Sequence, residues 1–341
     1  MDVLVVGAGP SGCKTAEIVA KKGYDVLILE EHPEIGKPVQ CSGLVSQRIG
    51  RIPKEIIVNR IKRARFCCKN TYFEIKSNKT VYVINRNRFD KYLAKIAREA
   101  GAKFQFKKKF PNMKNKKRIY QTKLLVGADG SNSTVAKVSG IKLPDNLLFA
   151  LQCRINSDFD PKSVELWFGS DVAPDNFAWI VPENENTARV GLMTNKNPNR
   201  YFEKFLKKRF GECEQKDRIG DVIRYGLIER SVSENVLLVG DAACMLKPFS
   251  AGGLVYGQVG AKYAGNACIE ALETKDFSEK FLSQNYDKQW KKELSWPIIK
   301  GMLFKKLFSN ISDSSILFSI IKNLKITKLS SFLDMDFLGK D

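Results

Sequence analysis

The sequence predicts an α/β fold, and three observations lead to this prediction. Residues 3–6 are a continuous run of Val and Leu, which is typical of a strand buried on both faces of a parallel sheet. A glycine-rich turn and a helix-like segment rich in Ala, Ile and Val follow at once, and a second strand-like run occupies residues 25–29. At roughly 150 residues per domain, a chain of 341 residues suggests two domains or one large domain with insertions.

Composition narrows the classes of partner and site. Lys and Arg number 57 and Asp and Glu 37, which gives a formal net charge of +20. Such a charge favours phosphates, nucleic acid, acidic lipid surfaces or an acidic protein, without choosing among them. The single histidine, His32, excludes a His-rich metal site, and we predict no metal centre. The eight cysteines contain no C-x-x-C pair, so we expect neither a zinc ribbon nor a disulfide scaffold, and a reducing compartment is indicated.

The turn after the first apolar run has the spacing G-x-G-x-x-G between a strand and a helix. Gly7 permits the tight turn, Gly9 lets backbone approach a pyrophosphate, and Gly12 lets helix and strand pack closely. Ser11 lies where the helix begins, and the free backbone N–H groups of a helix N-terminus attract phosphate. Glu30 ends the second strand, 18 residues beyond Gly12, and can accept hydrogen bonds from ribose. These residues predict a dinucleotide site in a Rossmann-like domain; the alternative is an ordinary glycine-rich turn.

Three later segments bear on the choice between NAD and FAD. A corner that contains Arg86 precedes an amphipathic helix at residues 91–100. One buried strand ends at Asp129, and another, at residues 235–241, ends in Gly-Asp and leads through a glycine-rich segment into a long helix at about residues 255–272. An aspartate at a strand end is often only a helix cap. The order of these segments, however, resembles the FAD-containing hydroxylase and reductase superfamily.

That resemblance implies FAD as the cofactor and gives roles to particular residues. The aspartate after the last strand would meet the ribityl chain, and the glycine-rich helix N-terminus would face the phosphates and the isoalloxazine. In this sequence the implied FAD contacts are Asp241, Gly252, Gly253 and Leu254. Arg86 would lie at the strand-to-helix corner beside the flavin, whereas Asp129 would brace the dinucleotide-binding domain.

Two further segments narrow the resemblance. Residues 34–44 read Glu-Ile-Gly-Lys-Pro-Val-Gln-Cys-Ser-Gly-Leu, and residues 177–182 read Phe-Ala-Trp-Ile-Val-Pro before Ala-Arg-Val-Gly-Leu at residues 188–192. Both resemble segments of the geranylgeranyl reductase family of FAD-dependent oxidoreductases, and the likeness runs from residue 2 to about residue 286. The resemblance implies that the first segment contacts the cofactor and that the second lines a hydrophobic substrate tunnel. The implied residues are Cys41, Ser42 and Gly43 for the cofactor, and Phe177, Trp179 and Pro182 for the substrate.

The chain departs from the family pattern at several positions. The cysteine loop is one residue short, and Phe177 and Val181 stand where the family usually has Tyr and Phe. Each implied role also has a structural alternative. Trp179 is equally well explained as a core aromatic residue of a sheet, and Cys41 as a small buried residue of a loop.

The resemblance implies a reductase that saturates the double bonds of geranylgeranyl (prenyl) chains in archaeal-type membrane lipids or their precursors. Reduced FAD would deliver hydride, and Cys41 or an ordered water would supply the proton. An external electron donor is needed, and ferredoxin, reduced deazaflavin and NAD(P)H all remain open. A flavin-dependent aromatic hydroxylase is the alternative. A nucleic-acid-binding protein is the least favoured reading, because the lysines are scattered without interleaved aromatic residues.

We expect three regions along the chain. Residues 1–65, 85–150 and 230–275 would form a discontinuous FAD-binding domain, and residues 66–84 and 151–229 an inserted substrate-binding domain with a mixed sheet. Residues 276–341 would form C-terminal helices.

The C-terminal region leaves two readings open. Apolar residues recur at helical spacing in residues 298–307 and again in residues 316–324, with lysines between them. These helices would either pack on the core with a solvated basic face or dock on an anionic membrane surface. No apolar run reaches the roughly 20 residues of a bilayer span, and no signal peptide is evident. We expect a cytoplasmic protein, peripheral on the inner face of the cell membrane if docking occurs.

Overall fold

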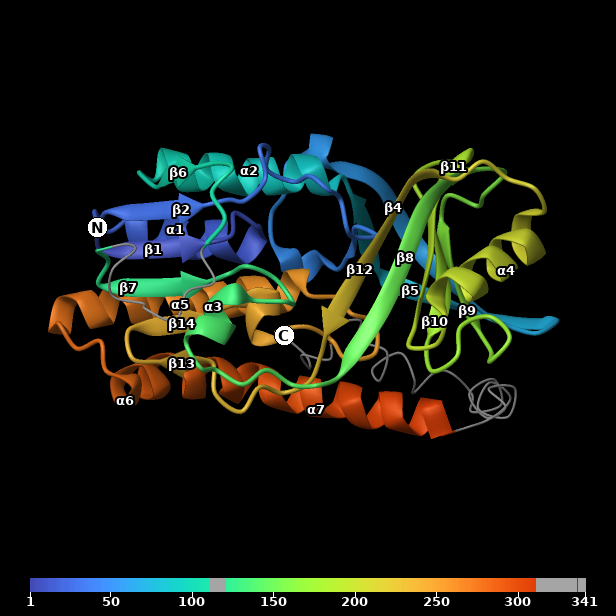
Figure 1. Cartoon of the computed structure of the whole chain (residues 1–341). Coiled ribbons are helices and arrows are strands. Elements are labelled where there is room, and N and C mark those ends of the chain that lie inside the picture. Colours follow the sequence, from blue (N-terminus) through green and yellow to red (C-terminus); the bar gives the residue numbers. More distant parts are fainter. Residues whose placement is uncertain (111–120, 311–335, 337–341) are drawn as a thin grey trace. The chain divides into compact units, whose positions relative to one another are not determined.

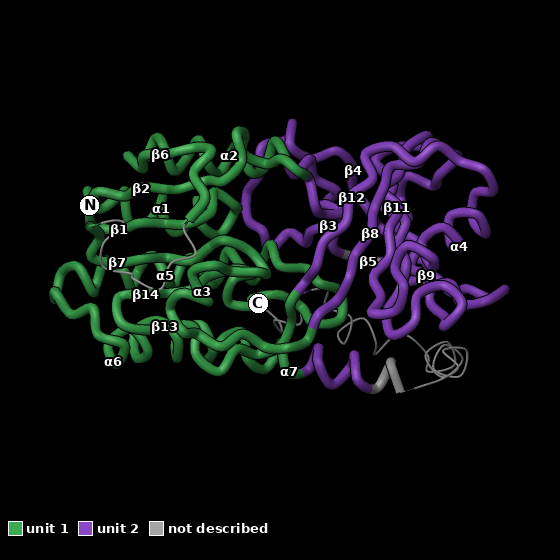
Figure 2. The backbone as a smooth tube through the Cα atoms, in the orientation of Figure 1, with its two compact units in different colours: residues 1–38, 87–146, 224–299 green, residues 39–86, 147–223, 300–341 purple. Residues whose placement is uncertain are grey.

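The computed structural model describes residues 1–110, 121–310 and 336 (Figure 1). The chain divides into two compact units (Figure 2): unit 1 comprises residues 1–38, 87–146 and 224–299, and unit 2 comprises residues 39–86, 147–223 and 300–341. Residues 39–65, which we expected with the FAD-binding segments, fall in unit 2. The reason is that two strands in this range belong to the sheet of unit 2: β3, Leu44–Val45, and β4, Ile57–Cys68, which runs unbroken through the expected boundary at residue 65.

Unit 1 contains a six-stranded sheet of order β13-β14-β7-β1-β2-β6. Its strands are β1 Val3–Val6, β2 Val26–Leu29, β6 Lys103–Gln105, β7 Leu124–Gly127, β13 Val232–Ser233 and β14 Val236–Leu238. All neighbours pair in parallel except β13 and β14. Every residue of β1, β7 and β14 is buried, which explains their continuous apolar character. The carboxyl ends of β14, β7, β1 and β2 therefore meet at one edge of the sheet.

Helices follow these strand ends. The helical segments that lie in or enter unit 1 are α1 Pro10–Ala20, α2 Arg86–Glu99, α3 Thr134–Val138, the 3-10 helix η3 Gly240–Ala243, α5 Leu254–Thr274, α6 Glu279–Leu282, the π-helical turn η4 Ser283–Asp287 and α7 Lys288–Asn310. The small residues of α5 let it approach α1 closely: a Cβ on Gly265 would lie 2.7 Å from the Cβ of Ile18.

Unit 2 contains an eight-stranded sheet of order β12-β8-β11-β10-β9-β4-β5-β3. Besides β4 its strands are β3 Leu44–Val45, β5 Thr71–Ile84, β8 Leu147–Asn156, β9 Ser163–Phe168, β10 Phe177–Pro182, β11 Thr187–Thr194 and β12 Lys216–Arg224. Strand β4 pairs in parallel with β9, whereas β10 pairs antiparallel with β9 and β11, so the sheet is mixed as predicted. Helix α4, Pro198–Phe210, and the 3-10 helices η1 Gln47–Ile49 and η2 Lys54–Ile56 complete the unit.

The two faces of this second sheet have different surroundings. Alternate residues of β10 and β11 form one buried cluster with α4; its members there include Ala178, Ile180, Val190, Leu192, Phe202 and Phe205. Because successive side chains of a strand point to opposite faces, Phe177 and Trp179 of β10 lie on the other face. Arg189 and Gly191 of β11 lie there with them, since Trp179 pairs with Gly191 and Val181 with Arg189.

The C-terminal helix α7 is partly core. Trp290, Leu294 and Ile298 recur every four residues and are fully buried, whereas Trp296 and Leu303 are 59% and 54% exposed. The second apolar repeat expected at residues 316–324 lies outside the described residues. Among the residues that are described, no helix is long and apolar enough to cross a bilayer.

Candidate functional site

The glycine-rich turn of unit 1 joins β1 to α1. Gly7 has φ +101°, and a Cβ there would lie 2.3 Å from the carbonyl oxygen of Ala128; a Cβ on Gly12 would lie 2.1 Å from the carbonyl oxygen of Gly7. Both positions therefore require glycine for packing. Gly9 differs, because a Cβ there would meet nothing within 4 Å. Its backbone borders open space at the start of α1, where no side chain caps the helix and no acidic residue lies in the first turn.

Glu30, at the end of β2, is buried beside this turn. Its Oε2 accepts a hydrogen bond from the N–H of Ala8 at 2.8 Å, and its Oε1 accepts one from the N–H of His32 at 2.9 Å. The Nδ1 atom of His32 also lies 2.7 Å from Oε1. Glu30 thus braces the turn, a role the motif alone did not indicate. A carboxylate has about four lone-pair sites, so it can still accept from ribose hydroxyls.

Ser11 brings three segments of unit 1 together. A Cβ on Gly240 would lie 2.5 Å from the Ser11 hydroxyl, and a Cβ on Gly257 would lie 2.4 Å from it. The side-chain amide of Gln258 donates to the carbonyl of Pro10 at 3.0 Å. The N-terminus of α1 therefore lies against both η3, which follows β14, and the first turn of α5.

The residues expected after β14 lie at the same place. Asp241 is exposed in η3, and a Cβ on Gly253 would lie 2.6 Å from its Oδ1 atom. The Asp241 carboxylate thus approaches the backbone immediately before α5 begins at Leu254. The side chain of Lys247 covers Gly252, where a Cβ would lie 2.5 Å from its Cε atom. Unit 1 therefore brings together Gly7, Gly9, Ser11, Gly12, Asp241, Gly252, Gly253 and Leu254, with Glu30 bracing the turn.

Asp129 has a structural role in the same unit. Its Oδ1 accepts from the Ser133 hydroxyl at 2.6 Å, and its Oδ2 accepts from the N–H groups of Thr134 and Val135 at 2.7 and 3.0 Å. Burial raises the pKa of the Asp129 carboxyl above 3.8, and these hydrogen bonds oppose that rise. The carboxylate caps α3, as expected for a residue that braces the domain.

These features of unit 1 fit a bound dinucleotide. Open backbone at Gly9 and an uncapped helix start suit a pyrophosphate. Carboxylates at the ends of β2 and β14 are acceptors for ribose and ribityl hydroxyls. All of these groups lie at one edge of one parallel sheet, where open α/β sheets bind ligands.

In unit 2, the loop that contains Cys41 joins the edge of the sheet through β3. Gly43 has φ +71°, and its carbonyl accepts a hydrogen bond from the N–H of Ile84 at 2.9 Å. The half-buried Cys41 Sγ accepts a hydrogen bond from the N–H of Gly43 at 3.3 Å. Ser42 lies between them, and its hydroxyl accepts from the N–H of Leu44 at 3.5 Å, which is a long contact. The loop is thus a tight turn anchored on β5.

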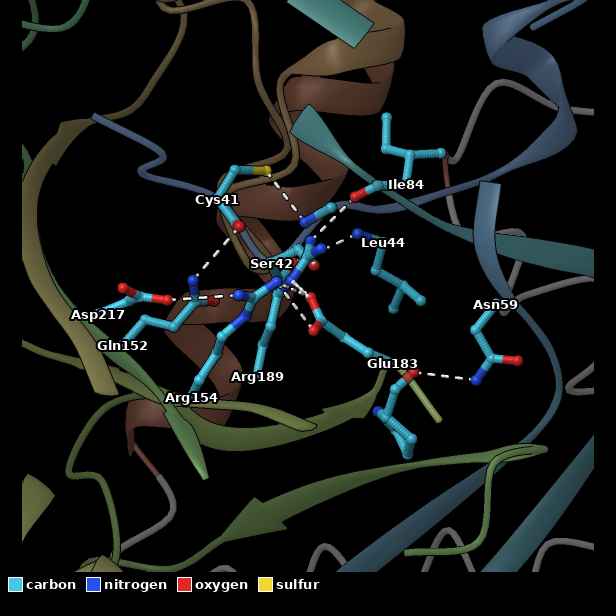
Figure 3. Close-up of polar contacts among 12 residues, drawn as sticks. Cys41, Ser42, Leu44, Asn59, Ile84, Gln152, Arg154, Glu183, Arg189 and Asp217 are labelled. Atoms are coloured by element: carbon cyan, nitrogen blue, oxygen red, sulfur yellow. Dashed lines mark hydrogen bonds and ion pairs between the residues drawn. The ribbon is translucent and has the colours of Figure 1, made fainter. Parts of the chain in front are cut away.

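Gln152 of β8 connects this loop to Trp179. Its Nε2 donates to the Cys41 carbonyl at 3.3 Å, and its Oε1 accepts from the Trp179 indole N–H at 3.3 Å (Figure 3 shows the former contact). The indole covers Gly191, where a Cβ would lie 2.3 Å from the ring. Cys41 and Trp179, which are far apart in sequence, therefore lie on one face of the sheet.

The other two expected substrate residues, Phe177 and Pro182, lie on opposite faces of the sheet. The ring centroid of Phe177 lies 5.5 Å from that of Phe168 and 6.3 Å from that of Trp179, so Phe177 extends the same aromatic surface. Pro182, by the alternation along β10, falls on the face toward α4, and its carbonyl accepts from Asn59 Nδ2 at 2.9 Å. The structure does not bring Pro182 together with Trp179. Arg86 is half-buried at the first residue of α2, the expected strand-to-helix corner.

Comparisons with known proteins agree on one family. A family described as "FAD binding domain" matches residues 1–275. A digeranylgeranylglycerophospholipid reductase of Methanosarcina acetivorans is 32% identical, covering 99% of this chain and 91% of that protein, and one from Methanococcoides burtonii is 30% identical with the same coverage. The chain belongs to the digeranylgeranylglycerophospholipid reductase family. The crystal structure of a geranylgeranyl bacteriochlorophyll reductase-like protein from Thermoplasma acidophilum is also similar, with a TM-score of 0.87, 26% identity and coverage of 99% of this chain and 94% of that one.

Membership of the digeranylgeranylglycerophospholipid reductase family confirms the predicted fold class and FAD as the cofactor. A probable FAD-dependent monooxygenase from Pseudomonas aeruginosa has a TM-score of 0.70 but only 14% identity, so it shares the fold alone. The comparisons thus favour the reductase over the hydroxylase alternative.

Sequence reasoning missed several residues around the Cys41 loop. Arg189 and Glu183 form a buried ion pair there, and Gln152 bridges the loop and Trp179. One signal was present: Arg189 is a charged residue inside the otherwise apolar strand β11. Its partner is separated from it by the β10–β11 turn, so only the register of that hairpin identifies the pair.

Proposed function

We propose that this protein is an FAD-dependent reductase that saturates prenyl double bonds in archaeal-type membrane lipids or their precursors. The names of its relatives support the substrate class. The observation that carries the proposal is the joining of Cys41 and Trp179 through Gln152 on one sheet face. The backbone of the cysteine loop and an aromatic surface are thereby held on the same face, which supports a site for an apolar alkene beside a proton donor.

The chemistry divides between cofactor and protein. FAD, when bound and reduced, supplies a hydride equivalent to one carbon of the double bond. The other carbon must receive a proton, so that C=C becomes CH–CH. An isolated alkene has no carbonyl oxygen to polarise, so the protein contributes position, a dry environment and the proton.

We assign these tasks to particular residues. Phe177 and Trp179 are assigned to the prenyl chain, because their rings form a continuous aromatic surface on the face of the sheet that Gln152 links to the Cys41 loop. The Cys41 thiol donates the proton, and the resulting thiolate is protonated again from solvent. The half-buried position of Cys41 in a turn held by Gly43 and Gln152 supports this role, because the thiol is fixed and can still exchange its proton with solvent. An ordered water is the competing proton donor.

The cofactor contacts are proposed from the geometry of each unit. The backbone at Gly7, Gly9, Ser11 and Gly12 would hold the pyrophosphate, Glu30 a ribose, and Asp241 the ribityl chain. Residues 252–254 would face the flavin from the N-terminus of α5. The resemblance also assigns Arg86 and the loop Cys41-Ser42-Gly43 to the cofactor.

Two partners are implied by the reaction. The substrate is a prenylated lipid, and a reductant must return two electrons to FAD after each bond. Ferredoxin, reduced deazaflavin and NAD(P)H remain the candidate donors. We also propose an anionic membrane surface as the place where the lipid is met, because the chain carries a net charge of +20.

The function is tested by anaerobic reduction of a digeranylgeranylglycerol lipid with dithionite-reduced enzyme, followed by mass spectrometry of the product. We expect a mass gain of two hydrogens per saturated bond. Oxygen consumption that depends on substrate, with a hydroxylated product, would instead support the hydroxylase alternative.

Cys41 is tested in the same assay. Loss of a general acid typically costs roughly 100-fold or more in rate, and we expect Cys41→Ser to lower single-turnover alkene reduction to about that extent with normal FAD content. Cys213→Ser is the matched control, because Cys213 is the other half-buried thiol of unit 2. A normal rate in Cys41→Ser would assign proton delivery to water.

A further inference from the structure

A buried ion pair lies directly behind the Cys41 loop (Figure 3). Arg189 and Glu183 are 5% and 7% exposed, and the Nε atom of Arg189 lies 2.6 Å from Oε1 of Glu183. Glu183 directly follows β10, and Arg189 lies within β11. Arg154 of β8, which is half-exposed, approaches the same carboxylate at 2.9 Å from its Oε2 atom. Glu183 is therefore held between two arginines.

The other edge of the Arg189 guanidinium is directed at the loop. Its Nη1 donates to the carbonyl of Ser42 at 2.7 Å and to the carbonyl of Ile84 at 3.0 Å. A Cβ on Gly43 would lie only 2.2 Å from the same nitrogen. One planar group thus links the strand turn, the loop and the end of β5, and the loop approaches it as closely as a glycine allows.

Stability alone is a poor reason for this arrangement. Taking two charges out of water costs free energy that their attraction only roughly repays, and well-packed apolar residues commonly serve as well. An arginine, however, fixes the direction of several hydrogen bonds at once through its rigid fork. A lysine in its place retains the charge and loses that fork.

We propose that Arg189 is a positioning residue for the reaction: oriented by Glu183, it sets the place of the Cys41-Ser42-Gly43 loop and hence of the Cys41 thiol. Arg189 acts through the loop backbone and not on the substrate. Its effect on alkene reduction rests on the proposed function, whereas its effect on the loop does not.

The loop is tested through the chemical reactivity of Cys41. In a Cys213→Ser background, Cys41 is the one cysteine of the chain that is not buried, since the other six are. We expect Arg189→Lys to speed iodoacetamide labelling of Cys41 about tenfold, equivalent to losing one hydrogen bond from a charged donor. The labelling is read on the Cys41 peptide by mass spectrometry. Labelling of Cys153, which is buried on the opposite face, must stay slow in the same sample.

Arg209→Gln is the matched control. Arg209 pairs with Glu165 at 3.0 Å in the same unit, but Glu165 lies on the α4 side of the sheet, and the pair does not contact the loop. This variant should label Cys41 at the rate of the background protein. Unchanged Cys41 labelling in Arg189→Lys, or equal acceleration at Cys41 and Cys153, would overturn the proposal.

A second variant changes the contact from the loop side. Gly43→Ala places a methyl group 2.2 Å from Nη1 of Arg189 and 2.5 Å from the Ile84 carbonyl oxygen that this nitrogen binds, so the loop must move away from Arg189, and we expect faster Cys41 labelling, as in Arg189→Lys. This keeps the proposal testable if Arg189→Lys does not fold. Normal Cys41 labelling in Gly43→Ala would contradict it.

The catalytic consequence is read separately. Single-turnover alkene reduction by Arg189→Lys, measured per bound FAD, should fall about tenfold, with an unchanged rate of reoxidation by oxygen. If Arg189→Lys speeds Cys41 labelling but the parent enzyme reduces no alkene, the proposed function is contradicted and the positioning role of Arg189 is supported. Normal alkene reduction together with accelerated labelling would show that the loop position does not limit the reaction, and would overturn the catalytic part.

Discussion

The two units build their sites from different parts of the chain. In unit 1 the site is made mainly of backbone: Gly7 and Gly12 allow close packing, and Gly9 leaves open space before an uncapped helix. In unit 2 it is made of side chains, because Arg189 and Gln152 hold a loop whose own residues are small. A backbone site depends on the absence of atoms, and a side-chain site on the exact placement of a few. Added atoms should therefore disrupt the site of unit 1, whereas loss of side-chain hydrogen bonds should disrupt the site of unit 2.

The largest expected effect tests the backbone site. Alanine favours a helix over glycine by about 1 kcal/mol, so propensity alone predicts that Gly12→Ala stabilises α1. The contact at 2.1 Å between a Cβ and the Gly7 carbonyl oxygen opposes this, and overpacking of this kind costs roughly 1–3 kcal/mol. We expect Gly12→Ala to lower the free energy of unfolding of the apoprotein and to lose FAD, as measured by denaturant titration and flavin absorbance.

Gly9→Ala is the matched variant at the same turn. A Cβ there meets nothing within 4 Å and Gly9 has φ −70°, so the stability of the apoprotein should change by less than about 1 kcal/mol. The added methyl group would occupy the space for the pyrophosphate, so FAD should bind at least tenfold more weakly. Equal effects of the two substitutions on apoprotein stability would show that the open space is not specific to Gly9.

What could be predicted from sequence follows the same division. Gly7, Gly9 and Gly12 stand within six residues of one another, so their spacing, together with the flanking strands and Glu30, predicted the turn and a dinucleotide ligand. Asp241 and residues 252–254 were assigned through the resemblance to the FAD-containing superfamily, which rests on the order of segments along the chain. In unit 1, residues close together in sequence carried the prediction of the turn, whereas the choice of FAD also needed the resemblance.

Unit 2 shows where such reasoning ends. The contact between Arg189 and Ser42 joins residues 147 apart in sequence, and it requires the register of β10 with β11 as well as the course of a loop. Strand β4 was not recognised as one element because it reads Arg-Ile-Lys-Arg-Ala-Arg through residues 60–65, and this misplaced the expected boundary. Charged residues in half-exposed strands hide the alternation on which prediction depends.

The next prediction concerns the stability effect of a buried lysine in unit 2, Lys305. Burial lowers the pKa of Lys305 in α7 from 10.5 to about 8, and the nearby Asp175 opposes this shift. Because the folded state holds this proton less tightly, the cost of burying the ammonium is complete below pH 8 and disappears as the pH rises to 10.5. Lys305→Met should therefore raise the free energy of unfolding at pH 7 by up to about 3 kcal/mol.

The pH dependence separates charge from packing. The gain from Lys305→Met should be mostly lost by pH 10.5 and absent above it, where both states of the parent protein are neutral at this position. Lys306→Met, at the exposed neighbouring position, should show neither the gain nor its pH dependence. A gain that is constant from pH 7 to 10.5 would mean that methionine acts by apolar packing, and that the buried charge of Lys305 does not lower the free energy of unfolding.

The smallest effect per residue concerns the surface of α7. Removal of the chain after residue 286 is a poor test of membrane docking, because Trp290, Leu294 and Ile298 are core residues. The exposed residues Trp296 and Leu303 are seven apart, which places them on one face of the helix, and exposed lysines stand at positions 292, 300 and 306.

This mixture of apolar and basic residues suits shallow contact with an anionic bilayer. Each lysine near the surface contributes about 1 kcal/mol to binding at low salt, so Lys292→Gln should weaken binding to phosphatidylserine vesicles about fivefold. Trp296→Ser should weaken it as well, and Tyr72→Ser, a similarly exposed aromatic residue of unit 2, should not. Vesicle sedimentation at two salt concentrations measures this. Equal binding to neutral and anionic vesicles would contradict the electrostatic part, and an effect of Tyr72→Ser equal to that of Trp296→Ser would show that the contact is not specific to α7.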